Sequence, residues 1–228
     1  MMNNTVNGYK MNSVEVEKLL QQMQSMYGEI NQVYLERSLE VVYSALNEWL
    51  RVFALRLDLR FADAHPCGDS DIPDCFQRQD SQVITRFIES LKSQLREVHR
   101  SKGHRHAFAA PKYIWVREQV TGMYPHYHLV LFFNKDHYAF LGNYTDNDGN
   151  NMAARLQKAW CSALKLPYPD YATLVNFPSN NAYYVDRADV MLLSPNYISF
   201  LYRMTYLCKE RTKLIGDGFR NFGCSQIK

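Results

Sequence analysis

The stretch that decides the fold of this chain is RVFALRLDLRF, residues 51–61. Apolar side chains alternate in it with small or charged ones, the pattern of a β-strand that has one buried face and one polar face. The apolar positions are Phe53, Leu55, Leu57, Leu59 and Phe61, and the positions between them are Ala54, Arg56, Asp58 and Arg60. On the polar face, Asp58 is expected to form a salt bridge with Arg56 or Arg60.

Before this strand, apolar residues recur at three- and four-residue steps, which predicts helices. Ser13 is the expected N-cap, and Gly28 is expected to divide the helical segment in two. Six glutamates against three basic residues give the first 50 positions a net charge of −3, whereas the rest of the chain carries +6. This asymmetry predicts an acidic helical extension over residues 1–50 and a separate domain over 51–228.

After the strand, the hydrophobic period changes several times. The pattern predicts a loop over 62–80, helices over 81–100, 152–166 and 195–210, a hairpin of strands over 113–120 and 126–133, and a strand over 171–177. The order β-α-β-β-α-β is that of the ferredoxin-like, or split βαβ, fold. We therefore expect an α+β protein with an antiparallel sheet, helices on one face of the sheet and the other face open.

Composition excludes a disordered chain and a membrane-spanning one. With 228 residues, 46% of them hydrophobic, and a net charge of +3, the chain is typical of a globular protein. The apolar run at residues 129–133 is far shorter than the roughly 20 residues that span a bilayer, and the polar N-terminus lacks the apolar core of a signal peptide. We expect a cytosolic protein with no membrane partner, and the charge is compatible with nucleic acid binding.

The predicted strand over 126–133 begins with His126-Tyr127-His128. Histidines at positions i and i+2 of a strand lie on the same face, about 7 Å apart. Glu118, near the end of the preceding strand, is expected to face them across the hairpin. Two imidazoles and one carboxylate can hold a divalent metal and leave positions open for a substrate oxygen. The alternative is two surface histidines and an exposed glutamate, and Asp58 is a further candidate for contact with a metal.

In the last predicted helix, Tyr202, Tyr206, Lys209 and Lys213 recur at steps of four, three and four residues and so share one face. A protonated tyrosine hydroxyl is a poor nucleophile, but a nearby cation and a metal-polarised phosphate would both help it to attack phosphorus. The same spacing is typical of core aromatics beside a lysine whose stem lies along an apolar surface. Spacing alone leaves both interpretations open.

Taken together, these motifs resemble those of HUH endonucleases, and more narrowly the single-tyrosine replication initiators that carry a Tyr-x-x-Lys motif. The segments at residues 115–119, 125–129 with 134–135, and 205–209 are similar to those of the YagK/YfjJ family. Members of that family are prophage-borne proteins related to the gene II-type replication-initiation proteins of filamentous phages (inoviruses). The resemblance covers roughly residues 50–215 and leaves the acidic helices outside it.

The resemblance implies a ferredoxin-like HUH endonuclease domain that makes a site-specific nick in single-stranded DNA. His126, His128 and Glu118 would hold Mg²⁺ or Mn²⁺, Tyr206 would attack the phosphate, and Lys209 would position the phosphate or the metal. Tyr202 is the second-ranked nucleophile.

The implied products are a 5′-phosphotyrosine link and a free 3′-OH that primes rolling-circle replication of a phage, prophage or mobile element in the bacterial host cytoplasm. Single-stranded or origin DNA is the implied partner, with a host replication helicase or polymerase as further candidates.

Basic residues supply candidates for DNA contact, most of them in a run between residues 92 and 112. Beside a nick site such residues would follow the phosphates, although a basic run is also typical of a solvated helix face. The candidates are Arg96, Arg100, Lys102, Arg105, Lys112, Arg203 and Lys213.

Two other functions stay open at this point. One is a DNA-binding regulator that keeps the same scaffold and does not cut. The other is an unrelated histidine-metal hydrolase, which would need a small-molecule pocket.

Overall fold

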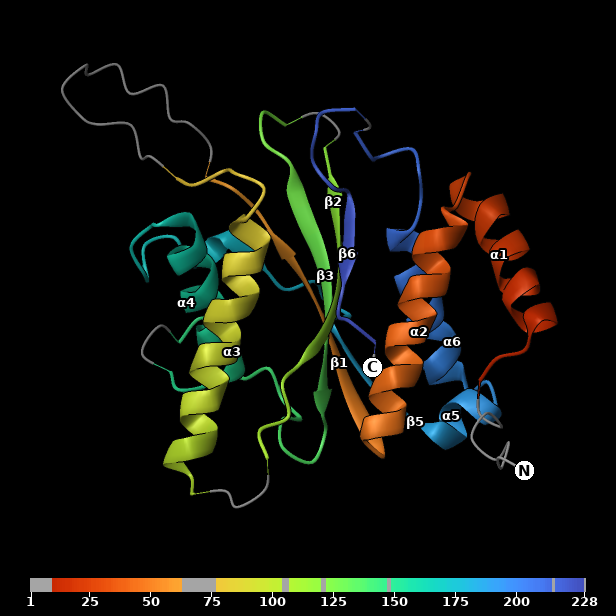
Figure 1. Cartoon of the computed structure of the whole chain (residues 1–228), viewed down its shortest axis with the longest axis horizontal. Helices are drawn as coiled ribbons and strands as arrows, with labels where there is room; N and C mark the ends of the chain where they lie inside the picture. Colours follow the sequence, from red (N-terminus) through yellow and green to blue (C-terminus); the bar gives the residue numbers. More distant parts are fainter. Residues whose placement is uncertain are drawn as a thin grey trace.

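The computed structural model describes residues 10–62, 77–103, 107–119, 122–146, 149–214 and 216–227, which form an α+β fold (Figure 1). The α+β class predicted from the sequence is therefore confirmed. The helices are α1 (Ser13–Tyr27), α2 (Gln32–Glu48), α3 (Val83–Ser101), α4 (Met152–Leu164), α5 (Arg187–Met191) and α6 (Pro195–Leu207), with a 3₁₀ turn η1 at Ala172–Leu174. The strands are β1 (Arg51–Leu59), β2 (Lys112–Glu118), β3 (His126–Asn134), β4 (Val175–Asn176), β5 (Ala182–Asp186) and β6 (Phe222–Cys224).

One open antiparallel sheet lies at the centre, with the strand order β4-β1-β3-β2-β6. The short strands β4 and β5 both pair with β1, β4 near its end and β5 along its first half. The predicted hairpin is present as β2 and β3, paired from Lys112 opposite Phe132 to Glu118 opposite His126. Strand β3 also pairs with β1 along almost its whole length, so it lies between β1 and β2 in the sheet.

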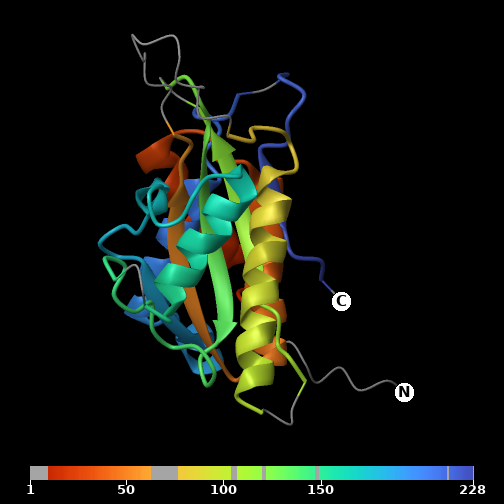
Figure 2. The ribbon, with the colours of Figure 1, turned by 90° about the vertical axis from the view of Figure 1, so that its left-hand side faces the viewer.

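Helices α3 and α4 lie side by side on one face of the sheet (Figure 2). Leu55 and Leu57 of β1 pack there in one cluster with Phe87 of α3 and Trp160 of α4, and all four side chains are fully buried. The Trp160 indole N–H donates a 2.6 Å hydrogen bond to the backbone oxygen of Arg60, so its polar group is satisfied inside the core.

Helices α1, α2 and α6 cover the opposite face, which the sequence analysis expects to be open (Figure 1). Leu39 and Leu46 of α2 and Met204 of α6 belong to one core cluster with Ala54 of β1 and Phe132 of β3. The physical reason is that this face of the sheet is largely apolar and would otherwise be in water. The helices before residue 51 therefore pack directly on the strands after it.

Because both faces are covered, the polar face predicted for β1 is not exposed to solvent. Arg56 and Asp58 are both buried. Their charges are compatible with burial because they form a salt bridge with each other, from Arg56 Nη2 to Asp58 Oδ1 at 3.5 Å, as the sequence predicts for Asp58.

Two helix ends determine how the candidate site is built. Helix α1 ends at Tyr27 and is capped by Gly28, whose φ of 81° requires glycine; the break at Gly28 is the one that the sequence predicts. Helix α6 ends at Leu207, short of the predicted end at 210. After it, the backbone N–H of Asn31 donates to the oxygen of Cys208 at 2.8 Å, and the N–H of Glu210 donates to the oxygen of Glu29 at 2.9 Å. These tertiary hydrogen bonds replace the next turn of helix.

Several short elements are not apparent from the sequence. Only Val175–Asn176 of the predicted strand over 171–177 is extended, and β5, α5 and β6 have five, five and three residues. Segments this short carry little periodicity, and pairing at the sheet edges stabilises the strands among them. Within the described ranges, the helices are too short or too polar to cross a membrane.

The packing of α2 on the sheet predicts that the N-terminal helices and the strands unfold as one unit. Leu39, 3% exposed, contributes to their shared core. We expect Leu39→Ala to lower the free energy of unfolding by about 2–5 kcal/mol, because it leaves a cavity. Urea denaturation followed by circular dichroism and tryptophan fluorescence should show one shifted transition.

Val33, on the same helix and 63% exposed, is the matched control. Val33→Ala should change the free energy of unfolding by less than about 0.5 kcal/mol. Two separate transitions in Leu39→Ala would show instead that the helices and the sheet are independent units.

Candidate metal centre

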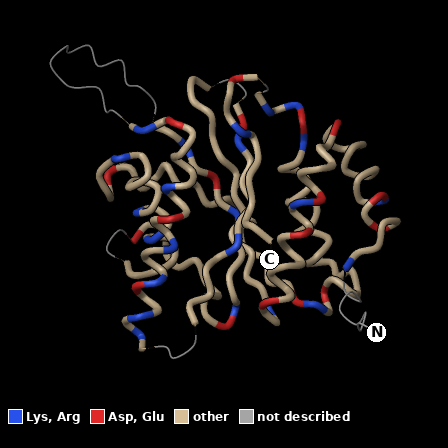
Figure 3. The backbone as a smooth tube through the Cα atoms, in the orientation of Figure 1, with Lys and Arg blue, Asp and Glu red and all other residues tan. Residues whose placement is uncertain are grey.

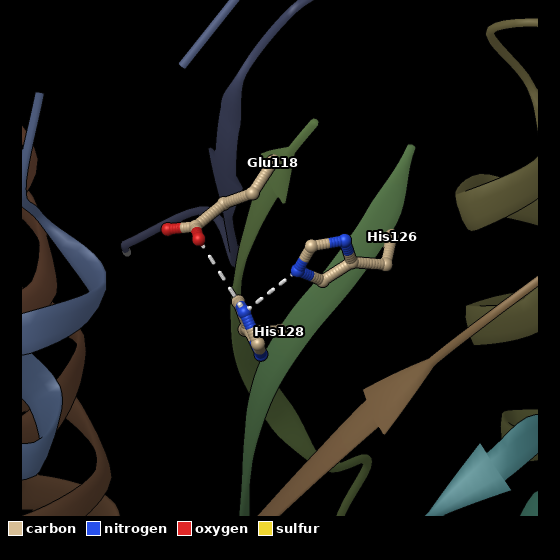
Figure 4. A group of neighbouring side chains, drawn as sticks. All are labelled: Glu118, His126 and His128. Atoms are coloured by element: carbon tan, nitrogen blue, oxygen red, sulfur yellow. Dashed lines mark hydrogen bonds and ion pairs between the residues drawn. The ribbon is translucent and has the colours of Figure 1, made fainter. Parts of the chain in front are cut away.

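Three side chains at one end of the sheet form a group that could hold a metal ion: Glu118, His126 and His128 (Figure 4). His126 and His128 begin β3, and the strand's alternation places them on the same face. Glu118 ends β2 directly opposite His126. One candidate ligand atom from each residue lies within 4.8 Å of the other two. The convergence predicted from the His-x-His spacing and the hairpin is therefore confirmed.

The donor set fits a divalent cation. The two Nε2 atoms lie 3.1 Å apart, and His128 Nε2 lies 3.5 Å from Glu118 Oε2. Three donors of this kind would leave coordination positions for water or a substrate oxygen. Nitrogen and oxygen donors together are compatible with several divalent metals, so the arrangement is a candidate metal site that does not select the ion.

Asp58 orients one of the candidate ligands. Its Oδ1 lies 2.5 Å from His128 Nδ1, and its Oδ2 accepts a 3.2 Å hydrogen bond from the Asn176 amide. An Nδ1–H that is bound by a carboxylate leaves Nε2 as the metal-binding nitrogen. Asp58 thus acts through His128 and is not one of the three converging ligands. Asp58 and His128 also face each other across β1 and β3, a pairing that the sequence alone does not reveal.

The two histidines have opposite pKa shifts. Burial and the charge of His128 lower the pKa of His126. Burial would also lower the pKa of His128, but its hydrogen bonds to Asp58 and Glu118 outweigh burial and raise it. For Asp58, burial raises the pKa, but the contact with His128 outweighs this effect and lowers it overall.

Two lysines hold the Glu118 carboxylate from the side of α6. Lys209 Nζ lies 3.1 Å from both carboxylate oxygens, and Lys213 Nζ lies 2.7 Å from Oε1. The side chains of both lysines are 1% exposed and that of Glu118 is 3% exposed. Burial raises the pKa of Glu118, but its contacts with His128 and Lys213 hold that pKa well below its usual value. The carboxylate is therefore ionised at neutral pH.

Tyr206 adjoins this buried ion cluster. It is half-buried on α6, and Lys209 Nζ lies 3.8 Å from the centre of its ring. The ring of Tyr27, the last residue of α1, contacts the same tyrosine edge-on at 5.0 Å between ring centres. Tyr202 lies one turn earlier on α6 and packs against the apolar core. Although α6 ends before Lys209, the chain that follows still brings this lysine to both Glu118 and Tyr206.

The basic run predicted to contact DNA does not lie beside the three ligands. Lys112 begins β2 and Glu118 ends it, so strand rise separates them by about 20 Å. Helix α3 ends at the same end of the sheet as Lys112 (Figure 1), and Figure 3 shows lysines and arginines along it. Arg96 stacks on Phe108, Arg100 pairs with Glu97, and Lys102 follows the last turn of α3.

The other candidates for DNA contact occupy different places. Lys112 pairs with Glu48 at 2.8 Å. Arg203 is half-buried on α6, three residues before Tyr206. Lys213 belongs to the ion cluster at Glu118, so it is not on an open surface. Arg105 lies outside the described residues.

The fold and these side chains define an α+β protein with a candidate divalent-metal site at one end of its sheet. The chain belongs to the YagK/YfjJ family, because the model of the YagK/YfjJ C-terminal domain matches residues 12–225. The match includes both N-terminal helices, which corrects the expectation that they lie outside the resemblance.

Two relatives from Escherichia coli (strain K12) are each 36% identical to the chain. The first, the uncharacterized protein YfjJ, aligns over 207 residues, 89% of this chain and 98% of its own length. The second, the uncharacterized protein YagK, aligns over 185 residues, 80% of this chain and 86% of its own length. No solved structure matches the chain.

The contact between Asp58 and His128 predicts a specific effect on metal binding. Asp58→Asn keeps the size of the side chain but removes the charge that holds the Nδ1–H of His128. We expect the affinity for Mn²⁺ to fall about 10- to 100-fold, as measured by electron paramagnetic resonance of free Mn²⁺. Asp136→Asn is the matched control, because Asp136 pairs with Arg51 at the far end of β3. An unchanged affinity in Asp58→Asn would exclude the positioning role.

The opposite pKa shifts predict that the two histidines titrate on either side of their usual value of about 6.5. In metal-free protein, His126 should lose its proton below that pH and His128 above it. A proton on His128 competes with the metal, so Mn²⁺ affinity should fall as the pH is lowered through the His128 pKa.

A titration followed by nuclear magnetic resonance of the imidazole signals would measure the pKa values of His126 and His128. The signals are assigned from their loss in His126→Gln and His128→Gln. Equal pKa values for the two residues would contradict the arrangement described here.

Proposed function

We propose that this protein is a metal-dependent endonuclease that nicks and rejoins single-stranded DNA through Tyr206, in the manner of HUH-type replication initiators. One observation carries the proposal: a continuous series of contacts joins the candidate metal ligands to the tyrosine. Glu118 contacts His128, Lys209 contacts Glu118, and the Tyr206 ring lies against the Lys209 ammonium.

The arrangement of the sheet supports this proposal. The order β4-β1-β3-β2, with α3 and α4 in the two crossovers, matches the split βαβ arrangement of ferredoxin-like folds. Because that fold hosts many unrelated functions, the proposal rests mainly on the site.

The proposed reaction is a transesterification at phosphorus. A divalent cation, Mg²⁺ or Mn²⁺ in this proposal, would be held by Glu118, His126 and His128 and would supply polarisation of the scissile phosphate. The Tyr206 oxygen forms a bond to phosphorus while the bond from phosphorus to the 3′ oxygen breaks. The phenol gives up its proton and the 3′ oxygen takes one up, which yields a 5′-phosphotyrosine and a free 3′-OH.

Lys209 has two roles in this scheme. Its ammonium favours the negative charge that develops on the phenol oxygen, and its ion pair holds Glu118 in place. The reverse reaction, in which a 3′-OH attacks the phosphotyrosine, rejoins the strand.

The proposed biological role is initiation of rolling-circle replication of a phage, prophage or mobile element in a bacterial cytoplasm. Its partners would be single-stranded or origin DNA and the host replication helicase or polymerase. The free 3′-OH left by the nick is the primer that such replication needs.

A covalent adduct tests the proposal. Purified protein is incubated with Mn²⁺ and single-stranded circular DNA of the element that encodes it, and the products are separated under denaturing conditions. We expect a protein–DNA adduct that EDTA abolishes and that Tyr206→Phe reduces at least about 100-fold. Mass spectrometry should locate the DNA on the peptide that contains Tyr206.

Tyr202→Phe is the matched control, because Tyr202 lies on the same helix one turn away. This substitution should leave the amount of adduct unchanged. If the adduct persists in Tyr206→Phe and disappears in Tyr202→Phe, the nucleophile is Tyr202. If the wild type binds DNA but forms no adduct with any divalent metal, and His126→Ala leaves that binding unchanged, the protein is a DNA-binding regulator on this scaffold.

A further inference from the structure

Arg56 is a buried cation with too few partners. Its side chain is 9% exposed, and its one salt bridge among the described residues, to Asp58, is long at 3.5 Å. Within the described part of the chain, its buried Nε has no hydrogen-bond partner. A guanidinium offers five N–H donors, and an unsatisfied buried donor is costly. The guanidinium therefore retains donor capacity that the described residues do not use.

Arg60 is a second cation at the same end of β1. Its backbone is held on both sides, because its N–H donates to Leu174 at 2.9 Å and its oxygen accepts from the Trp160 indole at 2.6 Å. The side chain is exposed and has no ion pair among the described residues. Leu59, the residue before Arg60, pairs with Tyr127, the residue after His126, so Arg60 follows β1 at the level of His126.

These arginines flank Asp58, the residue that orients His128. With Lys209 and Lys213, the two arginines make four cationic side chains near the two carboxylates of Asp58 and Glu118. Among these six described groups the positive charges outnumber the negative ones before any metal binds, and that excess favours an anion.

We propose that Arg56 and Arg60 bind a phosphodiester group of single-stranded DNA beside the candidate metal ligands. Arginine suits this role because its planar fork matches two phosphate oxygens. The inference rests on the proposed function, since it names the residues that hold the strand at the proposed nicking site. It also places phosphate contact at the opposite end of the sheet from the basic run on α3.

DNA binding without metal tests the inference. The probe is a fluorescent oligothymidylate, and its affinity is measured by anisotropy in EDTA over a range of salt concentrations. We expect Arg60→Gln to weaken binding about five- to tenfold and to reduce the slope of log affinity against log salt by about 0.7, the value for one phosphate contact. Arg56→Met should do the same.

Arg51→Gln is the matched control, because Arg51 is an exposed arginine at the opposite end of β1, and it should leave both affinity and slope unchanged. If Arg56→Met does not fold, Arg60→Gln alone tests the phosphate site, because Arg60 is exposed and its substitution should not disturb folding. Wild-type affinity and slope in Arg60→Gln, or an equal loss in Arg51→Gln, would overturn the inference.

The covalent-adduct assay separates this inference from the proposed function. A reduced slope in Arg60→Gln together with no adduct in the wild type would support the phosphate site and refute nicking. A normal adduct together with unchanged DNA affinity in Arg60→Gln would refute the phosphate site alone.

Discussion

The structure of the site depends on one buried charge, the carboxylate of Glu118. A carboxylate that is 3% exposed is stable only when it is paired, and here two lysine ammoniums and one imidazole surround it. The lysines come from the chain after α6, the imidazole from β3 and the carboxylate from β2, so the charge ties three parts of the fold together. Tyr206 lies against one of these lysines, and its position relative to the histidines follows from that pairing.

The N-terminal helices support the same cluster from outside. The segment between α1 and α2 binds the backbone on both sides of Lys209, through Asn31 with Cys208 and Glu210 with Glu29. These bonds end α6 early and direct the chain toward Glu118. The family match also begins at residue 12. The acidic helices are thus part of the framework that positions the proposed chemistry.

Charge is distributed unevenly along the sheet. Arg96, Arg100 and Lys112 lie toward one end of the sheet, and each is paired with a glutamate or stacked on an aromatic ring. At the other end, Arg56 and Arg60 lie beside the candidate ligands, and among the described residues Arg56 has one long salt bridge and Arg60 has none. If the protein acts on an anionic strand as proposed, cations with few partners near the site indicate where that strand binds. A larger number of paired cations elsewhere indicates this less well.

The sequence by itself determined the α+β class, the β2–β3 hairpin and the convergence of His126, His128 and Glu118, because strand alternation and hairpin pairing are local rules. It also marked Tyr206 and Lys209 as a pair, although their proximity does not come from a continuous helix. Only the tertiary structure decided that Asp58 orients His128, that Lys213 is buried against Glu118 and that the basic run lies far from the site. Those contacts join residues 70 or more positions apart, or depend on which end of a strand a residue occupies, and no local period in the sequence encodes either one.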